Sequence, residues 1–219
     1  MNNNMTTFEE DLVDVYYNLN NYFTIRNIPF SSIEKNKGGK GRGEIDILAV
    51  LIKNGRFMNC SHIEVSVSVT SKFPYNDTPE YIIKKFFSGG AEKEITGIIG
   101  NADYFSILVT SDFSKNAKDL LRKRLSEKEG VEVVSIASTG SKNYNTIILE
   151  MKYRDKTKKI LIQTFTHIFF QLLKKFQEKG YIYKNFQDSR LRSIQHQLHL
   201  MKKRDKLKEL WEEAKGDLK

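Results

Sequence analysis

The sequence is poor in cysteine and proline, with one and three residues respectively among 219. Because Cys60 has no second cysteine, an internal disulfide and a cysteine-rich zinc site are both excluded, and we expect a reducing, cytoplasmic compartment. No run of about 18 apolar residues occurs, which excludes a membrane-spanning helix. The first residues contain neither a basic segment nor an apolar one, so we expect no secretory signal and no membrane partner.

The chain does have enough apolar material to fold. Hydrophobic residues make up 39% of it, and 14 phenylalanines and 10 tyrosines supply large side chains for a core. This composition excludes wholesale disorder, and the length is typical of one large domain or of a core with an appended segment.

Positive charge is concentrated in the last third of the chain. Residues 1–150 contain 18 basic and 19 acidic residues, whereas residues 151–219 contain 18 and 8, so the net charge of +9 comes from the second segment. We therefore expect a core over 1–150 and a basic helical extension over 151–219. Such a charge suits a polyanion such as DNA; the alternative is a solvated helical face that keeps the protein soluble.

Apolar spacing predicts a mixed α/β core followed by helices. The expected helices cover 7–23, 78–88, 91–99 and 114–129. The expected strands cover 24–30, 44–52, 57–69, 104–110, 131–137 and 146–151. Pro29 indicates that the first strand lies at a sheet edge, and the glycine-rich, basic residues 35–43 indicate a loop. Two further helices are expected at about 157–180 and 188–215.

The second and third strands contain the most informative acids. Asn54-Gly55 predicts a tight hairpin turn between them. Because strand side chains alternate, Asp46 and Glu64 should both point away from the core face, and the hairpin would set them side by side. Two adjacent carboxylates favour a hard divalent cation, Mg²⁺ or Mn²⁺, which could assist hydrolysis of a phosphodiester. The alternative is a pair of ordinary polar strand residues.

The arrangement resembles the PD-(D/E)XK nuclease superfamily, in particular its restriction-endonuclease-like and Holliday-junction-resolvase-like members. The similarity covers about residues 6–110: an acidic first helix, a strand, a glycine-rich basic loop, GEIDILA at 43–49 and HIEV at 62–65. It implies an αβββαβ core with a mixed sheet and a metal-dependent DNA endonuclease or exonuclease. By resemblance, Asp46 and Glu64 are the metal-binding acids. One of Glu9, Glu10 and Asp11 would match the helix acid found in some members, and Glu10 is the preferred candidate.

One residue departs from the family pattern. Where the pattern has a lysine two residues after the second acid, this chain has Ser66, and a hydroxyl cannot supply positive charge. One explanation is that the lysine has moved, with Lys85 the preferred candidate and Lys84 and Lys72 the alternatives. Otherwise the metal acts alone, or the protein is an inactive relative that binds nucleic acid or assembles with partner proteins.

Several weaker candidates remain. Lys40 and Arg42 could hold a phosphate beside the acids. The cluster Lys202, Lys203 and Arg204 could follow a DNA backbone. His62 shares a strand face with Glu64 but is more often a structural residue in such a position. The apolar stripes of the C-terminal helices could pack on the core or form a homodimer interface.

Overall fold

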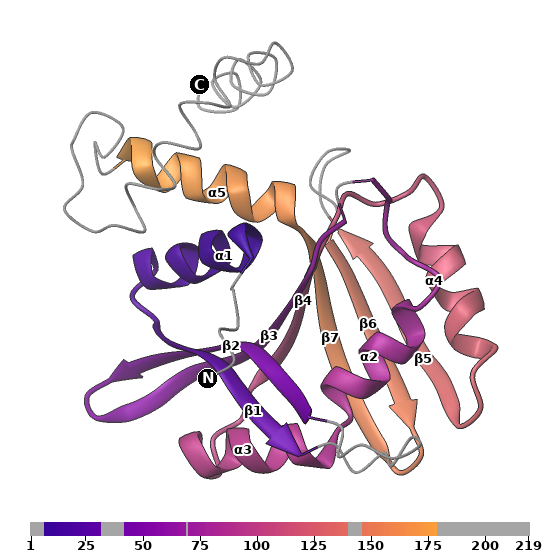
Figure 1. Cartoon of the computed structure of the whole chain (residues 1–219), viewed down its shortest axis with the longest axis horizontal. Coiled ribbons are helices and arrows are strands. Elements are labelled where there is room, and N and C mark those ends of the chain that lie inside the picture. The colour runs from indigo at the N-terminus through magenta and orange to yellow at the C-terminus, as the bar shows by residue number, and fades with distance from the viewer. Residues whose placement is uncertain (1–6, 32–41, 69, 140–145, 179–219) are drawn as a thin grey trace.

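The computed structural model describes residues 7–31, 42–68, 70–139 and 146–178. Within these ranges the chain forms an α/β fold with seven strands and five helices (Figure 1). The elements are α1 (Phe8–Leu19), β1 (Phe23–Ser31), β2 (Arg42–Lys53), β3 (Arg56–Ser66), α2 (Thr78–Phe86), α3 (Gly89–Ile99), β4 (Phe105–Thr110), α4 (Ala117–Ser126), β5 (Val131–Thr139), β6 (Thr146–Tyr153), β7 (Lys156–Thr164) and α5 (Phe165–Glu178). None of the helices in these ranges combines the length and apolar character needed to cross a membrane.

All seven strands belong to one mixed sheet, in the order β1-β2-β3-β4-β7-β6-β5. β3 and β4, and β4 and β7, are parallel, whereas the remaining neighbours are antiparallel. β1 therefore lies at a sheet edge, where Pro29 removes no central ladder bond. The parallel pairs need crossovers, which the segments containing α2 and α3, and α4 with β5 and β6, provide.

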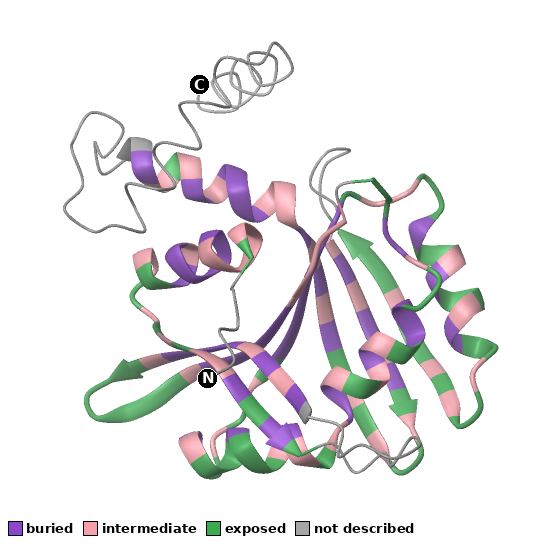
Figure 2. Ribbon diagram, viewed as in Figure 1, coloured by how far each residue is buried: buried purple, intermediate pink, exposed green. Residues whose placement is uncertain are grey.

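Helices cover both faces of the sheet. Alternate residues of β4 show this: Ile107 and Val109 pack with α1 and α5, while Leu108 packs with α2 and α4. Toward β1, the α3 residue Ile95 packs against Leu48 on the same face as α2. The central strands are thus buried on both sides, and Figure 2 shows buried residues running along them.

The β2–β3 hairpin has the expected turn, with positive φ at both Asn54 (53°) and Gly55 (71°). Its outer end extends beyond the helices (Figure 1) and is exposed (Figure 2). The inner end, where the two acids lie, is enclosed by α2.

The prediction of a helix beginning near residue 157 was wrong, because Lys156–Thr164 forms strand β7 and α5 begins only at Phe165. The strand has the two-residue alternation of a sheet: Ile160, Ile162 and Thr164 are buried, whereas the residues between them are only partly buried. In the sequence, the apolar residues of β7 and α5 form one continuous stripe with helical spacing, because no loop separates the two elements.

This correction also affects the expected division of the chain. A boundary at residue 150 falls inside β6, and β7 continues the same sheet between β4 and β6. α5 then packs against α1, with Phe169 and Leu172 beside Leu12. The helix expected at 188–215 lies outside the described residues.

Candidate active site

The two acids meet where the β2–β3 ladder ends. Their last paired residues are Ile47 and Ile63, so Asp46 and Glu64 occupy the next position across the hairpin. There the Val65 backbone N–H donates to Asp46 Oδ2 at 2.7 Å. The Asp46 carboxylate therefore accepts a hydrogen bond from a backbone N–H of β3 at the point where pairing between the strands ends, and this bond fixes the orientation of the carboxylate.

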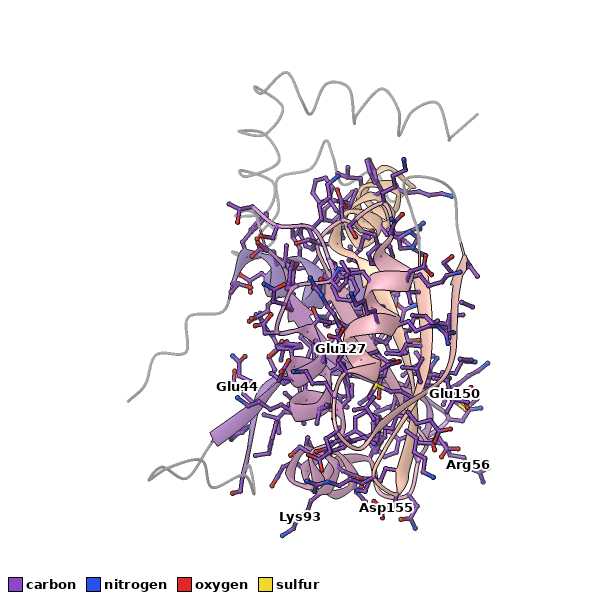
Figure 3. All side chains as sticks on the ribbon, turned by 90° about the vertical axis from the view of Figure 1, so that its right-hand side faces the viewer. Glu44, Arg56, Lys93, Glu127, Glu150 and Asp155 are labelled. Atoms are coloured by element: carbon purple, nitrogen blue, oxygen red, sulfur yellow. The ribbon has the colours of Figure 1, made fainter. Side chains whose placement is uncertain are left out.

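A lysine from α2 lies between these carboxylates. Lys85 Nζ is 2.5 Å from Glu64 Oε2 and 3.1 Å from Asp46 Oδ1, and it donates to the Glu44 carbonyl oxygen at 2.6 Å. The Glu44 side chain itself points to the edge of the molecule in Figure 3. The structure thus brings together Asp46, Glu64 and Lys85. These three candidate site residues from the sequence lie on separate elements, β2, β3 and α2.

The phase of α2 explains why Lys85 reaches the acids. Ile82 and Phe86 are buried in the core, which places Lys85 at the margin of the buried face, with only 14% of its side chain exposed. Lys84, one residue earlier, is exposed to solvent, and so is Lys72. Within the described part of the chain, Lys85 is the lysine that pairs with both acids.

Both acids point away from the face that Ile47 and Ile63 form with α1, but they are not exposed there: the side chain of Glu64 is 0% exposed and that of Asp46 is 12% exposed. The reason is that α2 and α3 cover the second face of the sheet, so the polar face of the hairpin is also buried. Burial raises the pKa of Glu64 to about 7, and the neighbouring Lys85 opposes this rise. Burial and the charge of Glu64 raise the pKa of Asp46 to about 6, against the opposing effect of Lys85.

Lys85 is held in its charged form. Burial alone would lower its pKa, but the two carboxylates outweigh burial and raise the pKa above its usual value. One ammonium facing two carboxylates leaves a net negative charge when both acids are ionised. The site therefore favours a further cation over a further anion.

Two further residues, not assigned to the site from the sequence, lie within electrostatic reach of Glu64. His62 Nε2 lies 2.6 Å from Glu64 Oε1, and the His62 side chain is 1% exposed. Burial, and after it the charges of Lys158 and Lys85, lowers the pKa of His62 to about 3, so the ring is neutral. Burial, and after it the charge of Glu64, raises the pKa of the Tyr81 phenol on α2. The only sequence signal for His62 was its position two residues before the acid, on the same strand face.

Glu10 lies near the acids but serves mainly as a helix cap. Its backbone N–H donates to Thr7 Oγ1 at 3.2 Å, and its carboxylate accepts from the Thr7 N–H at 3.3 Å, forming a capping box. Burial and the charge of Asp46 raise the pKa of Glu10, which places the two acids within electrostatic reach. Among the described residues, no group of three or more histidine, cysteine or acidic side chains is arranged to hold a metal. Glu10 therefore does not complete a three-residue ligand set here.

Ser66 lies beside the acids without supplying charge. Its carbonyl oxygen accepts from the Tyr75 hydroxyl at 3.2 Å, and it lines a small pocket with Tyr75, Tyr81 and Thr110. The Tyr75 hydroxyl also contacts Ser111 Oγ at 2.6 Å, which ties the ends of β3 and β4 to the loop before α2. This part of the site thus holds α2 in place.

The structure leaves most of the predicted DNA contacts undecided. Arg42 begins β2 opposite Ser31. The others, Lys40, Lys202, Lys203 and Arg204, lie outside the described residues.

Comparisons of the chain with protein-family models, curated proteins and solved structures gave no match. The function is therefore inferred from the chemistry of the site.

Proposed function

We propose that the protein is a Mg²⁺- or Mn²⁺-dependent nuclease that hydrolyses phosphodiester bonds in DNA, as an endonuclease or an exonuclease. The observation that carries this proposal is the contact of one lysine ammonium with two buried carboxylates, at 2.5 Å from Glu64 and 3.1 Å from Asp46. Perturbed acids around a fixed cation are typical of catalytic sites.

The order of elements supports a restriction-endonuclease-like core. α1, β1, β2 and β3 precede the helical segment, and β4 follows it, in the order that the PD-(D/E)XK resemblance implies. Asp46 lies on β2 and Glu64 on β3, the second and third strands, where the resemblance implies the two metal-binding acids. The cation comes from α2, which is consistent with a lysine that has moved from position 66.

The donor set fits the proposed metal. Mg²⁺ prefers hard oxygen ligands and usually takes only one or two protein carboxylates, with waters and substrate phosphates completing its shell. Asp46 and Glu64 would hold the ion, and their excess of negative charge over Lys85 would favour it. When bound, the cation would stabilise negative charge on the phosphate oxygens.

Lys85 would act as an electrostatic clamp. Its raised pKa keeps it protonated, so it is unsuited to accept a proton from water. The Glu44 carbonyl oxygen helps to fix the ammonium before substrate arrives, at 2.6 Å. A fixed positive charge can stabilise the negative charge that develops on the phosphoryl group without reorganisation.

DNA as the substrate is supported by charge. Residues 151–219 carry the positive excess of the chain, which would attract a polyanion while leaving the acidic site to the metal.

The first experiment measures cleavage of linear, single-stranded and branched DNA with Mg²⁺ or Mn²⁺. Lys85→Ala should lower the rate by about 10² or more with little change in DNA affinity, because the charge acts mainly in the transition state. Lys84→Ala is the matched control, one residue away and exposed, and should cut like the parent.

A second variant tests the role of the charge. In the double variant Ser66→Lys and Lys85→Ala, an ammonium returns from the strand position where the family pattern has it, and part of the missing rate should return. If Lys85→Ala cuts like the parent, Lys85 has no catalytic role. If the parent cuts with neither metal, the protein is instead an inactive relative that binds nucleic acid or assembles with partner proteins.

A further inference from the structure

His62 makes a direct, fully buried contact with one of the proposed metal-binding acids. The two residues lie two positions apart on β3, so their side chains share a face of the strand. His62 Nε2 is 2.6 Å from Glu64 Oε1, while the other carboxylate oxygen, Oε2, contacts Lys85 Nζ at 2.5 Å. Each oxygen of Glu64 therefore has its own nitrogen partner.

The imidazole is held by its surroundings. Its centroid is 5.0 Å from that of the Phe86 ring and 6.4 Å from that of Tyr104, and Leu48 pairs with His62 across the hairpin. The side chain is 1% exposed. The ring is therefore enclosed, with Nε2 directed at Glu64.

These contacts give the carboxylate one orientation. With Oε1 bonded to His62, Oε2 is directed to the side where Lys85 and Asp46 lie. That is also the side on which a cation shared by the two acids would sit. Hydrogen bonds to ligating carboxylates commonly fix their orientation, and removing such a partner typically costs 10- to 100-fold in metal affinity.

We propose that His62 is a positioning residue that orients Glu64 for metal binding through an Nε2–H donated to Glu64 Oε1. The inference rests on the proposed nuclease function, because it takes Glu64 as a metal ligand. It goes further by assigning a role to a buried histidine that does not itself reach substrate or metal.

The test compares Mn²⁺ binding by the full-length parent, His62→Leu and His62→Gln, using calorimetry and the electron paramagnetic resonance signal of free Mn²⁺. Leucine removes the donor, and affinity should fall about 10- to 100-fold. The glutamine amide can place an N–H near the position of Nε2 and should restore most of that affinity. Ile63→Val, a buried change on the opposite face of the same strand, is the control for general core disturbance and should bind like the parent.

A spectroscopic measurement tests the hydrogen bond without any metal. Nitrogen-15 correlation spectra of the parent should show His62 as the Nε2–H tautomer. The Nδ1–H tautomer would overturn the proposal, as would Mn²⁺ affinity unchanged in His62→Leu or unrestored in His62→Gln.

The two proposals fail in distinguishable ways. A parent that binds Mn²⁺ but cuts no DNA overturns the nuclease, while the three affinities still decide the role of His62. A parent that cuts DNA, with His62→Leu binding Mn²⁺ equally well, overturns only the positioning role. A parent that binds no Mn²⁺ overturns both.

Discussion

Replacing Glu64 with glutamine should stabilise the metal-free protein, and more strongly as the pH rises. Glu64 is completely buried, and burial raises its pKa from 4.5 to about 7 even though Lys85 opposes the rise. Glutamine keeps the shape of the side chain and an acceptor oxygen for His62 but never ionises. The variant therefore removes the cost of burying the charge while keeping the packing.

The pH range follows from the direction of the shift. An acid whose pKa is higher in the folded state binds its proton more tightly there, so its contribution to stability is intact below the unfolded pKa. That contribution disappears as the pH rises from about 4.5 to about 7. A pKa difference of about 2.5 corresponds to about 3 kcal/mol of unfolding free energy. Asp46 should add to the effect in the same direction, because the charge of Glu64 is one cause of its raised pKa.

The assay is urea unfolding of parent and Glu64→Gln in EDTA at pH 4 and pH 8. The unfolding free energy of the variant minus that of the parent should be about 3 kcal/mol larger at pH 8 than at pH 4. For a chain of this size, that difference corresponds to about 6–12 °C in Tm. Glu94→Gln, on the exposed surface of α3, is the control and should change the difference little. A gap between Glu64→Gln and parent that is equal at both pH values would refute the assignment of a buried, destabilising charge.

Two other expectations concern the fold and the DNA-binding residues. Gly90→Ala should destabilise the protein by about 1–3 kcal/mol in urea unfolding, because a Cβ would collide with the Ser31 carbonyl oxygen; a stable variant would contradict this close approach. Gly97→Ala is the matched control in the same helix, where nothing lies within 4 Å of the added Cβ, and should gain up to about 1 kcal/mol. Replacing residues 202–204 with alanine should weaken DNA binding and make the slope of log K against log salt shallower by about 0.9 for each phosphate that these side chains neutralise in the parent. An unchanged slope would place the DNA-binding surface elsewhere.

Local chemistry was sufficient to predict the hairpin and its acids. The Asn54-Gly55 turn fixes the β2–β3 connection, and alternation along each strand then sets Asp46 and Glu64 one step beyond the last pair, Ile47 and Ile63. Turn geometry and a two-residue period are properties of the nearest neighbours, so they can be read without knowing the rest of the fold.

Burial of the site and the identity of β7 depend on distant parts of the chain. From the sequence, Glu64 lies on the polar face of its strand, which would be expected to face solvent. In the fold, α2 and α3 cover that face of the sheet. β7 pairs in parallel with β4, about fifty residues earlier, and sequence spacing contains no direct signal of that partner. The apolar residues of β7 and α5 adjoin without a loop, so a helical period fits both segments when only the sequence is considered.

The position of the positive charge shows how local and distant information combine. The sequence restricts the candidates to a few lysines, and the burial of Ile82 and Phe86 favours Lys85 over Lys84 because it fixes the phase of α2. Contacts with distant residues hold that helix near the acids: Ile82 and Phe86 pack into the core, and the Tyr75 hydroxyl ties the preceding loop to β3 and β4. Two buried carboxylates are stabilised by a nearby cation, wherever in the chain it originates. The electrostatics of the site therefore favour a positive charge, and the tertiary fold determines that Lys85 supplies it.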